Sequence, residues 1–279
     1  MRTALSVAGS DPTGGAGLQM DLQVFRHFGV HGAATVTALT VQDTGGVRQV
    51  LPVFPSVAAD QLRRLVADVR PDALKLGMLA TDDVLRNVDL ALDGLERGPD
   101  PRHPAGLPPM VIDPVLIASD GTPLLERRAW RGLAGLCARA TLVTPNRPEA
   151  EELSGIDASG RRGAEAAARF FVEELGAGAA LVKGGHAGDG ADDCLAERRS
   201  DGVSIRWFEG ERIPGDPVHG TGCALSAAVA ARLACGDSVA DAVACARAFV
   251  RHAISNAHAI GRGARVLGFG ARGDGSAAW

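Results

Sequence analysis

The stretch "GDPVHGTGCALSAAVAARLACG", residues 215–236, places two glycines, a threonine and a cysteine directly before a run of small and apolar residues. This run predicts a buried helix over residues 222–234, which Gly236 is placed to end. A helix N-terminus leaves backbone N–H groups unpaired and carries a partial positive charge, so it favours an anion such as phosphate. Gly220 and Gly222 would let the backbone approach that anion without an intervening Cβ.

Cys223 falls in the first turn of this helix. We expect the field of the helix to favour the thiolate and to lower the pKa of the thiol. An anion hole beside a base is what phosphoryl transfer to a hydroxyl group requires, because charge must be stabilised and a proton accepted. A Gly-Thr-Gly tripeptide alone also fits a tight loop, with Cys223 as a core residue under the helix.

Outside this stretch, short apolar runs recur, each bounded by Gly, Pro or Asp. They predict buried strands of a parallel sheet over residues 3–8, 33–39, 73–78, 110–115, 141–145 and 179–185. Apolar residues at helical spacing lie at 18–28, 54–69, 129–138 and 163–175. Antiparallel strands are expected over 193–199 and 203–213, and a last helix over 239–259 that Asp237 or Ser238 caps. The alternation predicts an α/β fold with ligands at the carboxyl ends of the strands.

Composition narrows the class of protein. With 279 residues and 46% apolar content, the chain can bury one large core, and we expect a single domain over 1–265 followed by a flexible tail over 266–279. The net charge of −4, without long Lys/Arg runs, gives no support for a nucleic-acid or membrane-surface partner. No run of about 20 apolar residues and no signal-peptide core are seen, which favours a cytoplasmic location.

The cysteines are scattered and lack CxxC spacing, which indicates neither a disulfide framework nor a zinc site. Apart from Cys223, they are expected to be small core residues. The Pro-rich segment 96–109 is expected to be a surface loop.

"HGTGC" at 219–223 resembles the signature of the ribokinase-like superfamily, and specifically of the hydroxymethylpyrimidine/phosphomethylpyrimidine kinases of thiamine biosynthesis. Further matching motifs follow in the family's order: "VAGSDPTGGAGLQMDL" (7–22), "TALTVQDT" (37–44), "LKLGMLA" (74–80), "VIDPV" (111–115), "TPNRPEAEEL" (144–153) and "LVKGGH" (181–186). The resemblance implies a three-layer α/β/α fold with a mainly parallel central sheet and a homodimer. It also implies Mg-ATP-dependent phosphorylation of 4-amino-5-hydroxymethyl-2-methylpyrimidine and then of its monophosphate.

The resemblance also implies roles for single residues. Cys223 would be the catalytic base, beside an anion hole formed by Gly220, Thr221 and Gly222. Nucleotide contacts would come from Lys183, Thr144 and Asn146, and the metal would be held by Glu149, through water, and by Asp113. The "NRPE" segment fits equally well a helix start in which Asn146 and Glu149 form a capping box. His186 is interpreted as structural.

For the pyrimidine, the resemblance indicates Gly9, Asp21, Gln42, Met78 and Val115. Gln42 carries both an amide donor and an acceptor, so it can pair with an aminopyrimidine through two hydrogen bonds. Met78 and Val115 would supply apolar walls, or would be ordinary core residues. A pyridoxal or pyridoxine kinase and a non-catalytic pyrimidine sensor are the alternatives; the sensor would not need an anion hole.

The sequence departs from the family pattern on the approach to the signature. It reads "PGDPVHG" at 214–220, where Thr or Asn residues are common in the family, and Pro214 and Pro217 lack backbone donors. Asp43 stands where an asparagine is common. We therefore expect the nucleotide contacts on this approach to be made differently, with the anion hole unchanged.

Overall fold

The computed structural model describes residues 1–96, 106–185 and 191–269. Its central sheet has the strand order β3-β2-β1-β4-β5-β6-β7-β8-β9. The strands are β1 (Thr3–Ser10), β2 (His31–Asp43), β3 (Gly46–Pro52), β4 (Ala73–Leu76), β5 (Met110–Ile112), β6 (Leu142–Val143), β7 (Ala179–Val182), β8 (Asp193–Arg199) and β9 (Gly202–Phe208). Pairing is parallel from β2 to β7, while β3, β8 and β9 pair antiparallel at the two edges.

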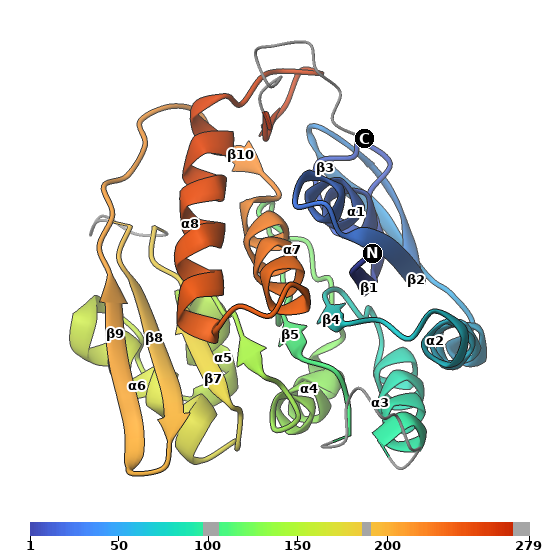
Figure 1. The fold of residues 1–279 in the computed structure, drawn as a ribbon. Coiled ribbons are helices and arrows are strands. Elements are labelled where there is room, and N and C mark those ends of the chain that lie inside the picture. The colour runs from blue at the N-terminus through green and yellow to red at the C-terminus, as the bar shows by residue number, and fades with distance from the viewer. Residues whose placement is uncertain (97–105, 186–190, 270–279) are drawn as a thin grey trace.

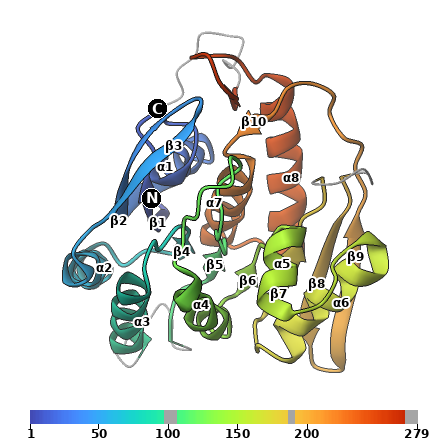
Figure 2. The ribbon, with the colours of Figure 1, turned by 180° about the vertical axis from the view of Figure 1, so that it is seen from behind.

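Helices cover both faces of the sheet, so the predicted three-layer α/β/α architecture is confirmed. Figure 1 shows α1 (Gly17–His27), α7 (Thr221–Ala234) and α8 (Val239–Ser255) in front of the sheet. Figure 2 shows the opposite layer with α2 (Pro55–Val69), α3 (Asp82–Glu96), α4 (Trp130–Cys137), α5 (Arg147–Ser154) and α6 (Gly160–Glu173). A short 3-10 turn (Arg127–Ala129) precedes α4, and a parallel pair, β10 (Val218–His219) and β11 (Arg265–Val266), lies outside the main sheet.

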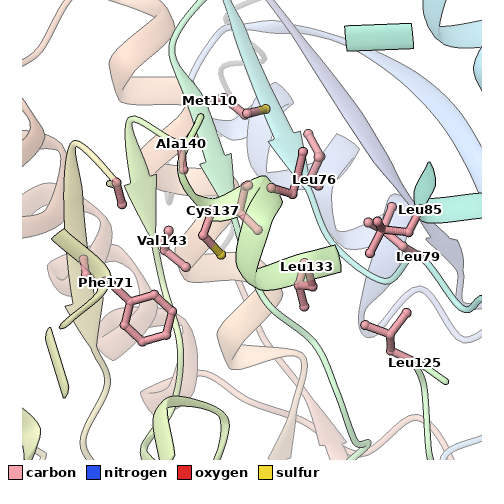
Figure 3. Close-up of a cluster of buried hydrophobic side chains, with 14 of the residues drawn as sticks. Leu76, Leu79, Leu85, Met110, Leu125, Leu133, Cys137, Ala140, Val143 and Phe171 are labelled. Carbon is pink, nitrogen blue, oxygen red and sulfur yellow. The ribbon is translucent and has the colours of Figure 1, made fainter. Parts of the chain in front are cut away.

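Each helical layer buries its own apolar cluster against the sheet. Figure 3 shows part of the larger cluster, in which Leu76 and Met110 of the strands face Leu133 and Cys137 of α4. The other cluster is unusually rich in alanine, because α7 is buried along almost its whole length. Small side chains allow α7 to pack closely between α1, α8 and the strands, which fixes its N-terminus against the sheet.

Most predicted elements are present, with shifted ends. The second antiparallel strand ends at Phe208 and the last helix at Ser255, both earlier than predicted. Gly236 follows the end of α7 with φ +97°, and Ser238 caps α8, as expected. Cys235 is exposed, which corrects its placement in the core, because it lies at the end of α7 where the helix leaves the sheet.

The predicted tail starts too early, since Val266 and Leu267 are buried and the Gly268 N–H donates to the Ala253 carbonyl. Residues 270–279, and most of the predicted loop 96–109, lie outside the described residues. Of the helices described here, none has the length and apolar content needed to cross a membrane.

Candidate active site

A cavity of about 500 Å³ lies at the carboxyl ends of the parallel strands, where the N-terminus of α7 also points. Its wall includes these predicted site residues: Gly9, Gln42, Met78, Asp113, Val115, Asn146, Glu149, Lys183, Gly220, Thr221, Gly222 and Cys223. Asp21 and Thr144 are not part of the wall. The fold therefore brings together residues that are more than 200 positions apart in the sequence.

Gly220 is the N-cap of α7, and its φ of +80° is a left-handed conformation that favours glycine. A Cβ on Gly220 would overlap the carbonyl oxygen of Gly15, so the N-terminal loop packs directly on this turn. A Cβ on Gly222 would instead lie 3.2 Å from Lys183 Nζ and 3.7 Å from Asp113 Oδ2. The N-terminus of α7 is thus open toward the Lys183 ammonium. The helix N-terminus and the ammonium together suit a phosphoryl group.

Cys223 is partly buried, and its sulfur accepts a hydrogen bond from the Gly17 backbone N–H. The pKa of the thiol is raised to about 11, mainly by burial and in addition by the nearby carboxylates of Asp113 and Asp21. The Lys75 ammonium and the Gly17 N–H act in the opposite direction. The expected lowering of the pKa was therefore wrong, because desolvation of a thiolate outweighs the donors at the helix N-terminus.

Asp113 follows β5 and is almost completely buried. One of its oxygens accepts a hydrogen bond from Lys183 Nζ at 3.0 Å, and the other lies 3.4 Å from the Ser226 hydroxyl of α7. Thr144 Oγ1 lies 3.3 Å from Asp113 Oδ1, behind the cavity wall. Thr144 thus supports Asp113 from behind the wall, and its assignment as a nucleotide contact stays a prediction.

Asn146 and Glu149 form the capping box of α5. The Asn146 side chain accepts from the Glu149 N–H at 2.9 Å, and Glu149 Oε2 accepts from the Asn146 N–H at 2.8 Å. Burial raises the pKa of Glu149 to about 7; Lys183 lowers it and Asp113 raises it. The capping box explains why α5 begins at this point. It also places the Glu149 carboxylate in the cavity wall, as a second carboxylate beside Asp113.

Gly9, Gln42, Met78 and Val115 also line the cavity. A Cβ on Gly9 would lie 2.8 Å from Met78 Sδ, so glycine at this position lets the methionine pack on the end of β1. Asp21 is instead fully buried behind the wall, where Lys75 Nζ donates to its Oδ2 at 2.9 Å. Asp21 thus pairs with a lysine that lines the cavity, and its own contact with a ligand stays a prediction.

Sequence reasoning missed Lys75, Asp11 and His219, which all line the cavity. The carboxylate of Asp11 lies 3.0 Å from His219 Nε2 and also accepts a hydrogen bond from the Gln42 side chain. Burial alone would raise the pKa of Asp11, but hydrogen bonds from His219, Gln42 and Thr13 outweigh it and hold the pKa at about 2. The signals were a lysine inside an apolar strand and a histidine directly before the glycine turn.

Across the described residues, no group of three or more His, Cys, Asp or Glu side chains is arranged to hold a metal ion. Asp113 and Glu149 both line the cavity, and the ammonium of Lys183 is paired with Asp113. His186 lies outside the described residues.

Comparison with known proteins agrees with this geometry. A family model described as phosphomethylpyrimidine kinase matches residues 11–267. The hydroxymethylpyrimidine/phosphomethylpyrimidine kinase of Staphylococcus aureus strain MRSA252 is 36% identical over 265 residues, which cover 94% of this chain and 91% of the relative.

Solved structures give the same result for the fold. The phosphomethylpyrimidine kinase of Clostridium difficile superposes with a TM-score of 0.77 at 29% identity, over 91% of this chain and all of that one. An ADP complex of Bacillus subtilis pyridoxal kinase superposes with a TM-score of 0.82 at 30% identity, over 96% of both chains.

Proposed function

The chain belongs to the phosphomethylpyrimidine kinase family, and from that premise we propose which phosphate acceptor it uses and how. The acceptor is 4-amino-5-hydroxymethyl-2-methylpyrimidine, and the resulting monophosphate is then phosphorylated to the diphosphate for thiamine biosynthesis. The observation that carries this proposal is the shared cavity. Gln42, Met78, the turn at Gly220–Gly222 and Cys223 all line it.

ATP is the phosphate donor of this kinase, and the cavity offers two features that suit it. The α7 N-terminus and Lys183 supply N–H donors and a positive charge for the phosphates. Leu225, Val250 and Ile254 of α7 and α8 line the same cavity and give an apolar wall for a purine base.

We propose that the transfer uses the following residues. Cys223 accepts the proton of the substrate hydroxyl while the hydroxyl oxygen bonds to the γ-phosphorus of ATP. ADP leaves with the electrons of the broken P–O bond. Gly220, Thr221 and Gly222 stabilise the charge on the moving phosphoryl group through their backbone N–H groups. Gln42, fixed by its hydrogen bond to Asp11, pairs with the aminopyrimidine ring, and Gly9, Met78 and Val115 enclose it.

Mg²⁺ is part of this proposal. Two carboxylates beside a phosphate site form the kind of donor set that Mg²⁺ uses, since it keeps several waters and takes the remaining ligands from phosphates. Asp113 raises the pKa of Glu149, and a cation between them would relieve this repulsion. Glu149 and Asp113 would hold the ion, Glu149 through water, and the ion would supply charge neutralisation for the phosphates. Asn146 would face the nucleotide from the same turn.

A pyridoxal or pyridoxine kinase is the second candidate, favoured by the superposition on a pyridoxal kinase in complex with ADP. Both substrates carry a hydroxymethyl group on a heteroaromatic ring, so the anion hole does not distinguish them. An ADP-release assay with the hydroxymethylpyrimidine, its monophosphate and pyridoxal, with products identified by mass, separates the candidates. Conversion of both pyrimidines supports the first; turnover of pyridoxal alone supports the second; no turnover contradicts both.

We also propose a homodimer. The outer hairpin of β2 and β3 exposes Leu39, Val41 and Leu51, and Leu39 and Leu51 are directly paired across the two strands. A row of exposed apolar side chains on a sheet is typical of an interface. Light scattering coupled to gel filtration tests this, with Leu39→Glu expected to give monomers.

Two further expectations stay proposals: a single domain that includes the packed residues up to 268, and a cytoplasmic location, where ATP is available.

A further inference from the structure

Lys75 is the most unusual residue of the cavity wall. It lies inside β4, and both the strand and the lysine side chain are completely buried. Lysine is almost never fully buried unless it is paired. A buried charge at the edge of a reaction cavity therefore calls for an explanation beyond packing.

The hydrogen bonds of Lys75 leave part of its ammonium unused. Nζ donates to Asp21 Oδ2 at 2.9 Å, and the same oxygen accepts from the Ser6 hydroxyl. Within the described part of the chain, Asp21 is its one hydrogen-bond acceptor. An ammonium has three N–H donors. The other two donors have no partner among the described residues, and Lys75 borders the cavity.

Stability alone does not account for this pair. Taking two charges out of water costs several kcal/mol each, and apolar residues of similar size are often as stabilising. Gly77, two residues along, leaves the space that the ammonium occupies, because a Cβ there would lie 2.8 Å from Lys75 Nζ. The local sequence is thus arranged around the lysine head group.

Lys75 and Cys223 line the same cavity, and charged groups from several elements act on the Cys223 sulfur. Lys75 of β4 and Lys183 after β7 are positive, while Asp21 of α1 and Asp113 after β5 are negative. Lys183 is already paired with Asp113. Burial is the main influence that raises the pKa of the Cys223 thiol, and Lys75 is the strongest influence that lowers it.

We infer that Lys75 is a positioning residue for Cys223, whose buried ammonium is the counter-charge that the sulfur requires when it has lost its proton. The inference rests on the proposed role of Cys223 as the base. The thiol first releases its proton to water, and the thiolate then takes the proton of the substrate hydroxyl. Lys75 stays protonated throughout, so it changes the fraction of thiolate without exchanging a proton itself.

Removing Lys75 alone would leave Asp21 as an unpaired buried charge, which is strongly destabilising. In Asp21→Asn, by contrast, the amide oxygen still offers Lys75 Nζ an acceptor, and the Asp113 carboxylate still favours the ammonium. The test therefore compares Asp21→Asn with Asp21→Asn/Lys75→Met, in which the ammonium is removed. The readout is the pH dependence of alkylation of Cys223 by iodoacetamide. Trypsin cleaves after Arg212 and Arg232, so residues 213–232 form a peptide in which Cys223 is the one cysteine, and mass spectrometry can follow it alone.

We expect the alkylation midpoint of Asp21→Asn/Lys75→Met to lie at least one pH unit above that of Asp21→Asn. Equal midpoints would overturn the inference. We also expect kcat to fall at least tenfold between these variants, with the KM for the pyrimidine unchanged. A rise in KM with equal midpoints would show that Lys75 binds the substrate instead, and would likewise overturn the inference.

Two controls keep the result interpretable. Thermal unfolding of both variants checks the fold, and Asp21→Asn/Lys75→Gln replaces the methionine variant if that one does not fold. In a Cys223→Ala background, the change at Lys75 should have no further effect on kcat. Because alkylation needs no substrate, a protein that shows the midpoint shift but phosphorylates no pyrimidine contradicts the proposed function and leaves this inference standing.

Discussion

The substitution Gly222→Ala separates the chemistry of the anion hole from the stability of the fold. Gly222 lies in the first turn of α7, where alanine is favoured over glycine by about 1 kcal/mol. The added methyl would lie 3.2 Å from Lys183 Nζ, the mobile end of a long side chain, and in ordinary contact with Asp113. We therefore expect the melting temperature to stay the same or to rise slightly.

Activity should change in the opposite direction. The methyl would stand between the helix N-terminus and the Lys183 ammonium, where the proposed phosphoryl group must sit. The methyl leaves the backbone N–H in place but holds the phosphoryl group away from it, and the loss of one donor from an oxyanion hole typically costs 10²–10³ in kcat, or about 2.7–4 kcal/mol. We expect Gly222→Ala to lose kcat by this factor in an ADP-release assay at saturating pyrimidine.

Gly220→Ala is the matched control, with the same methyl two residues earlier. At φ +80° a non-glycine residue costs about 1–2 kcal/mol, and here the Cβ would also overlap the Gly15 carbonyl. This variant should lose both melting temperature and activity. If Gly222→Ala kept its fold and its kcat within threefold of the parent, Gly222 would not border the transferred group, and the position of the anion hole would be refuted.

Three further predictions concern the base, the pyrimidine and the loop. Cys223→Ala should lower kcat by roughly a hundredfold or more with pyrimidine binding nearly intact; full turnover, measured by ADP release, would exclude Cys223 as the base. Gln42→Ala should raise the KM for the pyrimidine more than that for ATP, and equal effects in steady-state kinetics would remove Gln42 from the pyrimidine pocket. Asp11, with its pKa lowered from 3.8 to about 2, stabilises the fold above pH 4 by roughly 2 kcal/mol. Asp11→Asn should lose this at pH 7, and the gap to the parent should narrow as the pH falls from 4 toward 2; a constant gap in urea unfolding would contradict the pairing with His219.

Apolar periodicity predicted the alternation of strands and helices, and the glycine turn before α7 is a local signal. The three layers and the other site residues were implied by the family resemblance, and all of the predicted site residues except Asp21 and Thr144 line the cavity. Sequence reasoning missed β3, a half-exposed edge strand without a buried apolar run. It also missed the pairing of β10 with β11, which joins residues about 50 positions apart through two residues each.

The pKa of Cys223 shows where local reasoning fails. The helix N-terminus is visible in the sequence, but the burial of the sulfur and the charges around it come from α1, β4 and β5. Asp21 gives a related example: in the sequence it is a polar residue on a helix face, and only the fold shows that it is fully buried and paired with Lys75 of the cavity wall.

The arrangement of the site follows from the register of the parallel strands. Leu76 pairs with Ile112, and Ile112 pairs with Val143. The residues that come next, Gly77, Asp113 and Thr144, therefore lie at one level, where the strands end. A slip of one residue would turn Asp113 toward the opposite face of the sheet, away from Lys183 and α7. Buried apolar pairs thus hold the charged groups in position, and this explains how such short strands can support a site made of isolated ion pairs.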